Sequence, residues 1–163
     1  MRCKGADAGP LPARYVHTNI VARDWRALAA FYEVVFGCRP VPPQREYRGG
    51  RLEAVTGIPG AHLEGMHLRL PGVGDAGPTL EIFSYDEAED CVTAAANRLG
   101  FAHIAFEVPD VPAALERVRA AGGGALGEVV TLESADGRRV TFCYATDPEG
   151  NVVELQSWEP AVL

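Results

Sequence analysis

The stretch His17-Thr-Asn-Ile-Val-Ala-Arg-Asp24 recurs in form as His103-Ile-Ala-Phe-Glu-Val-Pro-Asp110, with the same spacing from histidine to aspartate. In both copies a short apolar or β-branched run is followed by an aspartate, a residue that commonly caps a helix. Each half closes on a short apolar strand that carries one glutamate, Glu81 in the first half and Glu154 in the second. The chain therefore reads as two related halves, each supplying one imidazole and one carboxylate.

The bulk properties limit the partners that we expect. The chain has 163 residues, of which 47% are hydrophobic, enough for one domain or two half-domains that share a core. A net charge of −7 argues against a nucleic-acid partner. No run of about 20 apolar residues would span a membrane, and the first residues do not resemble a signal peptide. Four widely spaced cysteines without a CxxC motif favour a reducing compartment. We therefore expect a cytoplasmic protein that binds a small-molecule substrate.

Hydrophobic periodicity and turn residues predict the order β-α-β-β-β in each half. The first half is expected to contain a strand at 15–21, a helix capped by Asp24 and stopped by Gly37, a short edge strand and a loop with one helical turn within 39–61, and strands at 63–70 and 79–85. The second half is expected to contain a strand at 101–108, a helix from Asp110 to about residue 121, and strands near 125–132, 139–146 and 151–158. The predicted divisions are a flexible start at 1–12, a first module at 13–85, a linker at 86–99 and a second module at 100–163.

Strand alternation places the two histidines and two glutamates on one side of their strands. Their neighbours in sequence are mostly apolar and suit packing under the helix of the same half. A carboxylate on a partly buried face is costly unless it is paired or bound to a metal. His17, Glu81, His103 and Glu154 are therefore candidate ligands for one divalent cation.

Other polar residues have simpler interpretations. A single histidine or glutamate on a strand is usually structural, and only the repetition favours a metal site. Asp24 and Asp110 share the spacing but are expected to be helix caps. His62 and His67 have no counterpart in the second half, so each would at most contact a substrate. The acidic run that begins at Asp86 is typical of a solvated linker.

The stretch Tyr144-Ala-Thr-Asp-Pro-Glu-Gly-Asn-Val-Val-Glu-Leu155, together with Gly100-Phe-Ala-His103, resembles the vicinal oxygen chelate superfamily, the glyoxalase/bleomycin-resistance/extradiol-dioxygenase group. The resemblance covers about residues 13 to 158 and implies an α+β fold in which two βαβββ modules form a curved, partly open barrel. It also implies one divalent ion per site (Ni, Co, Zn, Mn, Mg or Fe) held by ligands from the first and last strands of each module. These ligands map onto His17, Glu81, His103 and Glu154.

The ligand pattern is similar to that of bacterial glyoxalase I, and it differs from methylmalonyl-CoA epimerase by Glu for Gln at position 81. This resemblance implies a lyase or isomerase that transfers a proton through a metal-stabilised enediolate. Glu154 is the first candidate for the base and Glu81 the second, while Arg69 and His67 are candidate substrate contacts. The alternatives are a small-molecule-binding or resistance protein and an iron-dependent ring-cleaving dioxygenase, although a fourth ligand at Glu81 argues against the latter. Open edge strands favour a homodimer, with the site inside one chain or shared between two.

Overall fold

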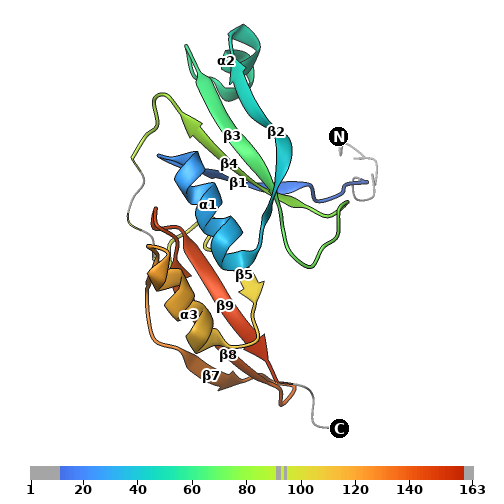
Figure 1. Cartoon of the computed structure of the whole chain (residues 1–163), viewed down its shortest axis with the longest axis vertical. Coiled ribbons are helices and arrows are strands. Elements are labelled where there is room, and N and C mark those ends of the chain that lie inside the picture. The colour runs from blue at the N-terminus through green and yellow to red at the C-terminus, as the bar shows by residue number, and fades with distance from the viewer. Residues whose placement is uncertain (1–11, 91–92, 94, 160–163) are drawn as a thin grey trace, which may run out of the picture.

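The computed structural model describes residues 12–90, 93 and 95–159, which form two sheets and three helices (Figure 1). The first half contains, in chain order, β1 (His17–Val21), α1 (Trp25–Phe36), β2 (Arg39–Arg48), α2 (Gly50–Thr56), β3 (His62–Arg69) and β4 (Thr79–Tyr85). The second half contains β5 (Ile104–Glu107), α3 (Val111–Ala120), β6 (Gly124–Ala125), β7 (Val130–Glu133), β8 (Arg139–Thr146) and β9 (Val152–Trp158).

Each sheet begins with a parallel pair and continues with antiparallel pairs. The first sheet has the order β1-β4-β3-β2, and the second has β5-β9-β8-β6 with β7 also paired to β8. β1 runs parallel to β4, and β5 runs parallel to β9. No strand pair joins the two sheets among the described residues, so the sheets form an open surface and not a closed barrel. The predicted α+β class is confirmed.

Both long helices begin where the sequence predicts. The Asp24 carboxylate accepts hydrogen bonds from the backbone amides of Arg26 and Ala27, each 3.0 Å long. The Asp110 carboxylate accepts one from Ala113 at 2.9 Å. α1 ends at Gly37, whose φ of 70° is the left-handed conformation that glycine adopts without strain. Both aspartates are therefore helix caps, as expected.

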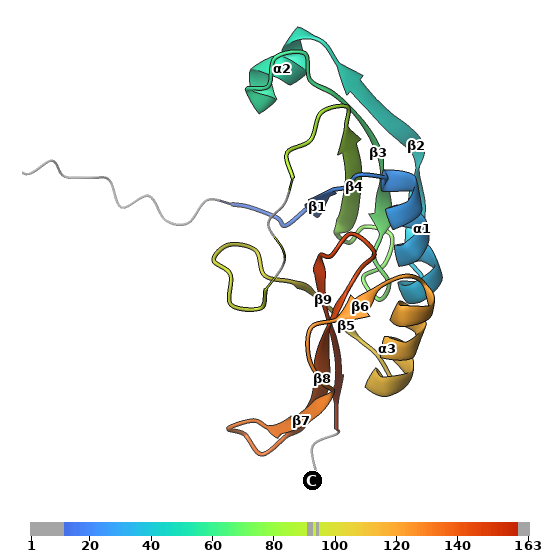
Figure 2. The same cartoon turned by 90° about the vertical axis from the view of Figure 1, so that its left-hand side faces the viewer.

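The two modules share one core on the helix side of the sheets, where α1 and α3 lie together (Figure 2). The Phe36 and Phe106 rings, one from each module, stack with centroids 4.0 Å apart. The Glu149 carboxylate accepts hydrogen bonds from the backbone amides of Arg23 and Asp24 at 2.7 and 3.0 Å. The tight turn between β8 and β9 is thus attached to the start of α1.

Four predicted elements differ from the structure. β2 has 10 residues where a short strand was expected, although it contains three prolines. An edge strand tolerates them because one row of its backbone amides needs no partner, and the register shifts between Val41 and Arg45 around the Pro42-Pro43 pair. The helical turn expected after it is a seven-residue helix, α2.

In the second half, the strand predicted at 125–132 is two short strands, β6 and β7, each paired with β8. β5 is shorter than predicted, so His103 immediately precedes it.

Some expectations fall wholly or partly outside the described residues. Residues 1–11 of the predicted flexible start and residues 91, 92 and 94 of the predicted linker are among these. Cys38 and Cys143 are free and buried, while Cys3 and Cys91 are not described. Within the described part of the chain, no helix is long and apolar enough to cross a membrane.

Candidate metal centre

The two modules place their histidine and glutamate in the same relation. Glu81 on β4 lies opposite Asn19 on β1, and Glu154 on β9 lies opposite Ala105 on β5. In each case the histidine precedes that opposing residue by two positions, so it points to the same side of the sheet. His17 Nδ1 lies 3.2 Å from Glu81 Oε1, and His103 Nε2 lies 3.1 Å from Glu154 Oε2. His17 and Glu81 are 64 residues apart, and His103 and Glu154 are 51 apart, yet the two pairs are equivalent in the fold.

The carboxylates of both pairs are more buried than the imidazoles. The side chains of Glu81 and Glu154 are 12% and 16% exposed, whereas those of His17 and His103 are 43% and 30% exposed. Burial of this degree penalises a charged carboxylate that has no cation beside it. Each pair thus offers one imidazole nitrogen and one carboxylate oxygen at an accessible face.

A third residue, His67, joins the pair of the first module. His67 on β3 lies opposite Glu81 on β4, and its Nε2 is 3.1 Å from Glu81 Oε1. Burial lowers the pKa of His67 and outweighs the opposing effect of the Glu81 carboxylate. From the sequence, His67 is expected to be at most a substrate contact, because it has no counterpart in the second half. The β3–β4 register places it beside Glu81, and no pattern in the sequence defines that register.

The position that corresponds to His67 in the second module holds an aromatic residue. Tyr144 on β8 lies opposite Glu154 on β9, as His67 lies opposite Glu81. Its ring centroid is 5.2 Å from that of His103. Each His–Glu pair is called a half-site below. The two half-sites are therefore equivalent in backbone position but differ in this neighbouring side chain.

The side of the first sheet that carries His17, His67 and Glu81 is called the ligand face below. The opposite side is covered by α1, since Leu68, Leu80 and Ile82 are fully buried there in the shared core. Three arginines also belong to the ligand face by strand alternation. Arg39 on β2 lies opposite Arg69 and pairs with Asp75, whereas the other two arginines are less exposed. Arg69 follows His67 by two positions on β3, and Arg45 on β2 lies opposite Gly65. Both are half-buried.

Within each half-site, the imidazole nitrogen and the carboxylate oxygen are spaced as two ligands of one divalent ion would be. Two adjacent ligands that bind an ion at 2.0–2.2 Å lie about 3 Å apart, close to the separation within each His–Glu pair. However, no group of three or more His, Cys, Asp or Glu side chains among the described residues is placed to hold a metal ion. The structure brings together His17 with Glu81 and His103 with Glu154, but it does not bring the two pairs into one group.

The outer edges of β1 and β5 have no strand partner among the described residues. A recess of about 640 Å³ is lined by residues of both strands, including Thr18 and Phe106, and by the loop that follows β3. None of the four predicted ligands lines this recess. Each half-site therefore lies next to an open sheet edge.

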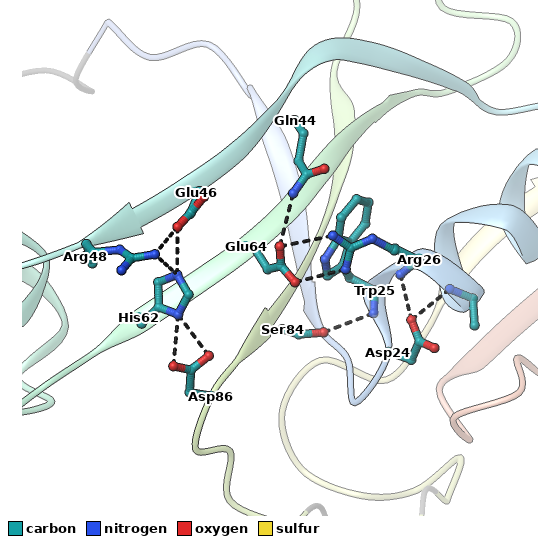
Figure 3. A network of polar contacts seen from close by, with 11 residues as sticks. Asp24, Trp25, Arg26, Gln44, Glu46, Arg48, His62, Glu64, Ser84 and Asp86 are labelled. Carbon is teal, nitrogen blue, oxygen red and sulfur yellow. Dashed lines mark hydrogen bonds and ion pairs between the residues drawn. The ribbon is translucent and has the colours of Figure 1, made fainter.

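A second polar network surrounds His62 (Figure 3). Strand alternation places His62 on the side of β3 opposite to His67. His62 Nδ1 lies 2.9 Å from Asp86, and its Nε2 lies 3.3 Å from both Glu46 and Arg48. The hydrogen bond to Asp86 is the main reason why the pKa of His62 is raised. Its ring nitrogens are occupied by these partners, so the geometry does not favour the substrate contact considered for His62.

Comparison with known proteins identifies the relatives of the chain. Residues 14–155 match the family described as the glyoxalase/bleomycin resistance protein/dioxygenase superfamily. An ethylmalonyl-CoA/methylmalonyl-CoA epimerase from Cereibacter sphaeroides is 29% identical over 143 residues, which cover 88% of this chain and 96% of that protein. The family is the one that the residues from Tyr144 to Leu155 indicated.

Solved structures show the same fold. A glyoxalase family protein from Bacillus cereus superposes with a TM-score of 0.72 at 23% identity, covering 96% of this chain and 99% of that one. A glyoxalase family protein from Enterococcus faecalis superposes with a TM-score of 0.55 at 21% identity, covering 88% and 96%. At these identities the similarity concerns the arrangement of the elements.

Proposed function

The chain belongs to the glyoxalase/bleomycin resistance protein/dioxygenase superfamily, and from this membership we propose that it is a metal-dependent isomerase. The proposed reaction moves a proton at the carbon next to the carbonyl of a substituted malonyl thioester. The main support is the repeated His–Glu pair, which supplies two imidazoles and two carboxylates to a divalent ion. The similarity to an ethylmalonyl-CoA/methylmalonyl-CoA epimerase favours this substrate class over others.

The proposed ligands are His17, Glu81, His103 and Glu154. Two carboxylates neutralise a divalent charge, and the imidazoles suit Ni, Co, Zn or Fe as well as Mn. When bound, the ion would act as a Lewis acid on the substrate carbonyl and so make the adjacent C–H group more acidic. The four proposed ligands would keep the carbonyl oxygen and the acidic carbon of the substrate close to a carboxylate base.

We assign the base to Glu154. Glu81 Oε1 contacts two imidazoles, those of His17 and His67, whereas Glu154 contacts only that of His103 among the described side chains. A carboxylate with fewer partners loses less when it turns toward a substrate proton. Glu154 would accept the proton from the acidic carbon. Glu81, the second candidate for the base, would return a proton to that carbon.

A second copy of the chain would complete the site. Support comes from the open edges of β1 and β5, each next to a half-site, and from the separation of the half-sites within one chain. Pairing β1 of one copy with β5 of another would satisfy the open backbone edges and bring the half-sites together. The proposed assembly is therefore a homodimer in which each site takes one half from each copy.

Exchange of the substrate proton with solvent tests the reaction directly. The metal-loaded protein is incubated with methylmalonyl-CoA in D₂O, and deuterium at the carbon next to the thioester is measured by mass spectrometry. The proposal predicts incorporation that is lost in Glu154→Gln and kept in Glu128→Gln, a change at an exposed residue of the β6–β7 connection. Absence of exchange with every divalent metal tried, or oxygen uptake with a catechol instead, would contradict the proposal.

A further inference from the structure

Two arginines on the ligand face have no acidic partner within the part of the chain that the structure describes. Arg45 and Arg69 are the only half-buried arginines in the described ranges, where the other arginines are exposed. Neither forms an ion pair with a carboxylate of the described residues. Arg45 donates a hydrogen bond to the carbonyl oxygen of Pro43, and Arg69 donates one to that of Gly77. A partly desolvated guanidinium that contacts only neutral carbonyl groups remains available to an anion.

The nearest carboxylate on the same face is already occupied. Arg69 and His67 lie on the same side of β3, about 7 Å apart at the usual rise of a strand. Arg45 lies opposite Gly65, on the other side of His67 along β3. Glu81 is the only carboxylate that strand alternation places on the ligand face among the strands of the first sheet, and it contacts both His17 and His67. The charge of the two guanidiniums is therefore not balanced by a carboxylate of the described residues.

We propose that Arg45 and Arg69 bind the carboxylate that a substituted malonyl thioester carries on its acidic carbon. This inference rests on the proposed function and names the part of the substrate that the first module recognises. The carboxylate and the thioester carbonyl of such a substrate are separated by a single carbon. A carbonyl held beside Glu81 would thus place the carboxylate within reach of the side chains on either side of His67.

Coenzyme A also carries anionic phosphates, and the position of the two arginines distinguishes these from the carboxylate. Phosphates of that group are many bonds away from the thioester carbonyl. Arg69 instead lies two residues from His67, which faces Glu81, and Arg45 lies on the neighbouring strand opposite Gly65, two residues from His67 in the other direction. The geometry therefore favours the group next to the reacting carbon, and bidentate binding of a carboxylate suits a planar guanidinium.

Calorimetric binding of two thioesters tests the proposal without requiring turnover. Methylmalonyl-CoA and isobutyryl-CoA differ in a single group, a carboxylate in place of a methyl group. The wild-type protein is expected to bind methylmalonyl-CoA roughly 10- to 100-fold more tightly, the range of one or two charged hydrogen bonds. Arg45→Met should remove most of this preference, and Arg69→Met should also reduce it. Arg45→Lys keeps the charge and should retain part of the preference for methylmalonyl-CoA. It therefore controls for a folding defect in Arg45→Met.

A matched control is available on the same strand. Arg48 lies on the other side of β2 and pairs with Glu46, so Arg48→Met should keep the wild-type preference. A methylmalonyl thioester of pantetheine, which lacks the nucleotide phosphates, should show the same loss in Arg45→Met. Equal weakening of both CoA esters in Arg45→Met, or no preference in the wild-type protein, would overturn the proposal. A retained preference without any deuterium exchange would instead reject the proposed reaction and leave the carboxylate site standing.

Discussion

The Tyr32 hydroxyl on α1 donates a 3.0 Å hydrogen bond to Asp147 Oδ2 in the turn between β8 and β9, and thereby joins the two modules. Both side chains are almost completely buried. Asp147 also accepts hydrogen bonds from the backbone amides of Glu149 and Asn151 and from the Asn151 side chain. Burial raises the pKa of Asp147 despite these donors, and it raises that of Tyr32 as well. This hydrogen bond therefore connects α1 to the turn that leads into β9, the strand that carries Glu154.

Removal of this hydroxyl should weaken the connection between the modules. Tyr32→Phe keeps the ring in the core but leaves one buried carboxylate oxygen with fewer donors. We expect the free energy of unfolding to fall by about 1–3 kcal/mol. Urea denaturation measures the change, and Tyr47→Phe serves as a control because Tyr47 is half exposed. Equal stability of Tyr32→Phe and the control would show that the hydrogen bond is not important.

Gly65 should not tolerate a side chain. A Cβ atom at this position would lie 2.1 Å from the carbonyl oxygen of Ile82 and 2.5 Å from Cδ1 of Phe83. We expect Gly65→Ala to separate β3 from β4 locally and to lower the free energy of unfolding by about 1–3 kcal/mol. At Gly127 a Cβ would meet nothing within 4 Å, so Gly127→Ala is the matched control. Denaturation of both variants decides the question, and wild-type stability in Gly65→Ala would show that the sheet is less closely packed there.

The His62 network should make stability depend on pH. Since the pKa of His62 is raised in the folded state, its protonated form is favoured by Asp86 and Glu46. The stabilisation should be fully present below the unfolded pKa of about 6.5 and should disappear as the pH rises through the higher folded value. The difference in unfolding free energy between wild type and His62→Gln should therefore shrink from pH 5.5 to pH 8.5. A difference that stays constant or grows over this range would contradict the assignment.

The shared site predicts that two inactive variants restore each other. In a dimer of His17→Ala and His103→Ala chains, one of the two sites combines an intact first half with an intact second half. Random mixing of the two variants should then recover about a quarter of the wild-type sites. Deuterium exchange by the mixture, compared with each variant alone, measures this recovery. Lack of recovery after mixing under conditions that exchange subunits would place each site within one chain.

The sequence predicted the helices and the paired residues well because local chemistry defines them. Asp24, Asp110 and Gly37 act within one turn of the backbone, so their roles follow from residue type alone. The relation of His17 to Glu81 followed from strand alternation and from the repeat. The four-ligand site, by contrast, depends on how the two sheets lie relative to each other, and no local pattern encodes that arrangement.

The extent of β2 and the role of His67 escaped the sequence for related reasons. Proline usually indicates the end of a strand, and only the edge position of β2 makes its three prolines acceptable. The position of His67 beside Glu81 depends on the β3–β4 register across the long turn at 71–78. Such a loop leaves the register open, whereas a two-residue hairpin turn would have defined it.

The metal content of single-histidine variants tests the central proposal most directly. Protein purified without chelator is analysed for divalent metals by elemental analysis, together with His17→Ala, His103→Ala and the control His62→Ala. Four ligands around one shared ion predict one metal per chain in the wild type and in the control, and loss of nearly all metal in both His17→Ala and His103→Ala. Full metal content in His103→Ala, with unchanged stability, would contradict the account.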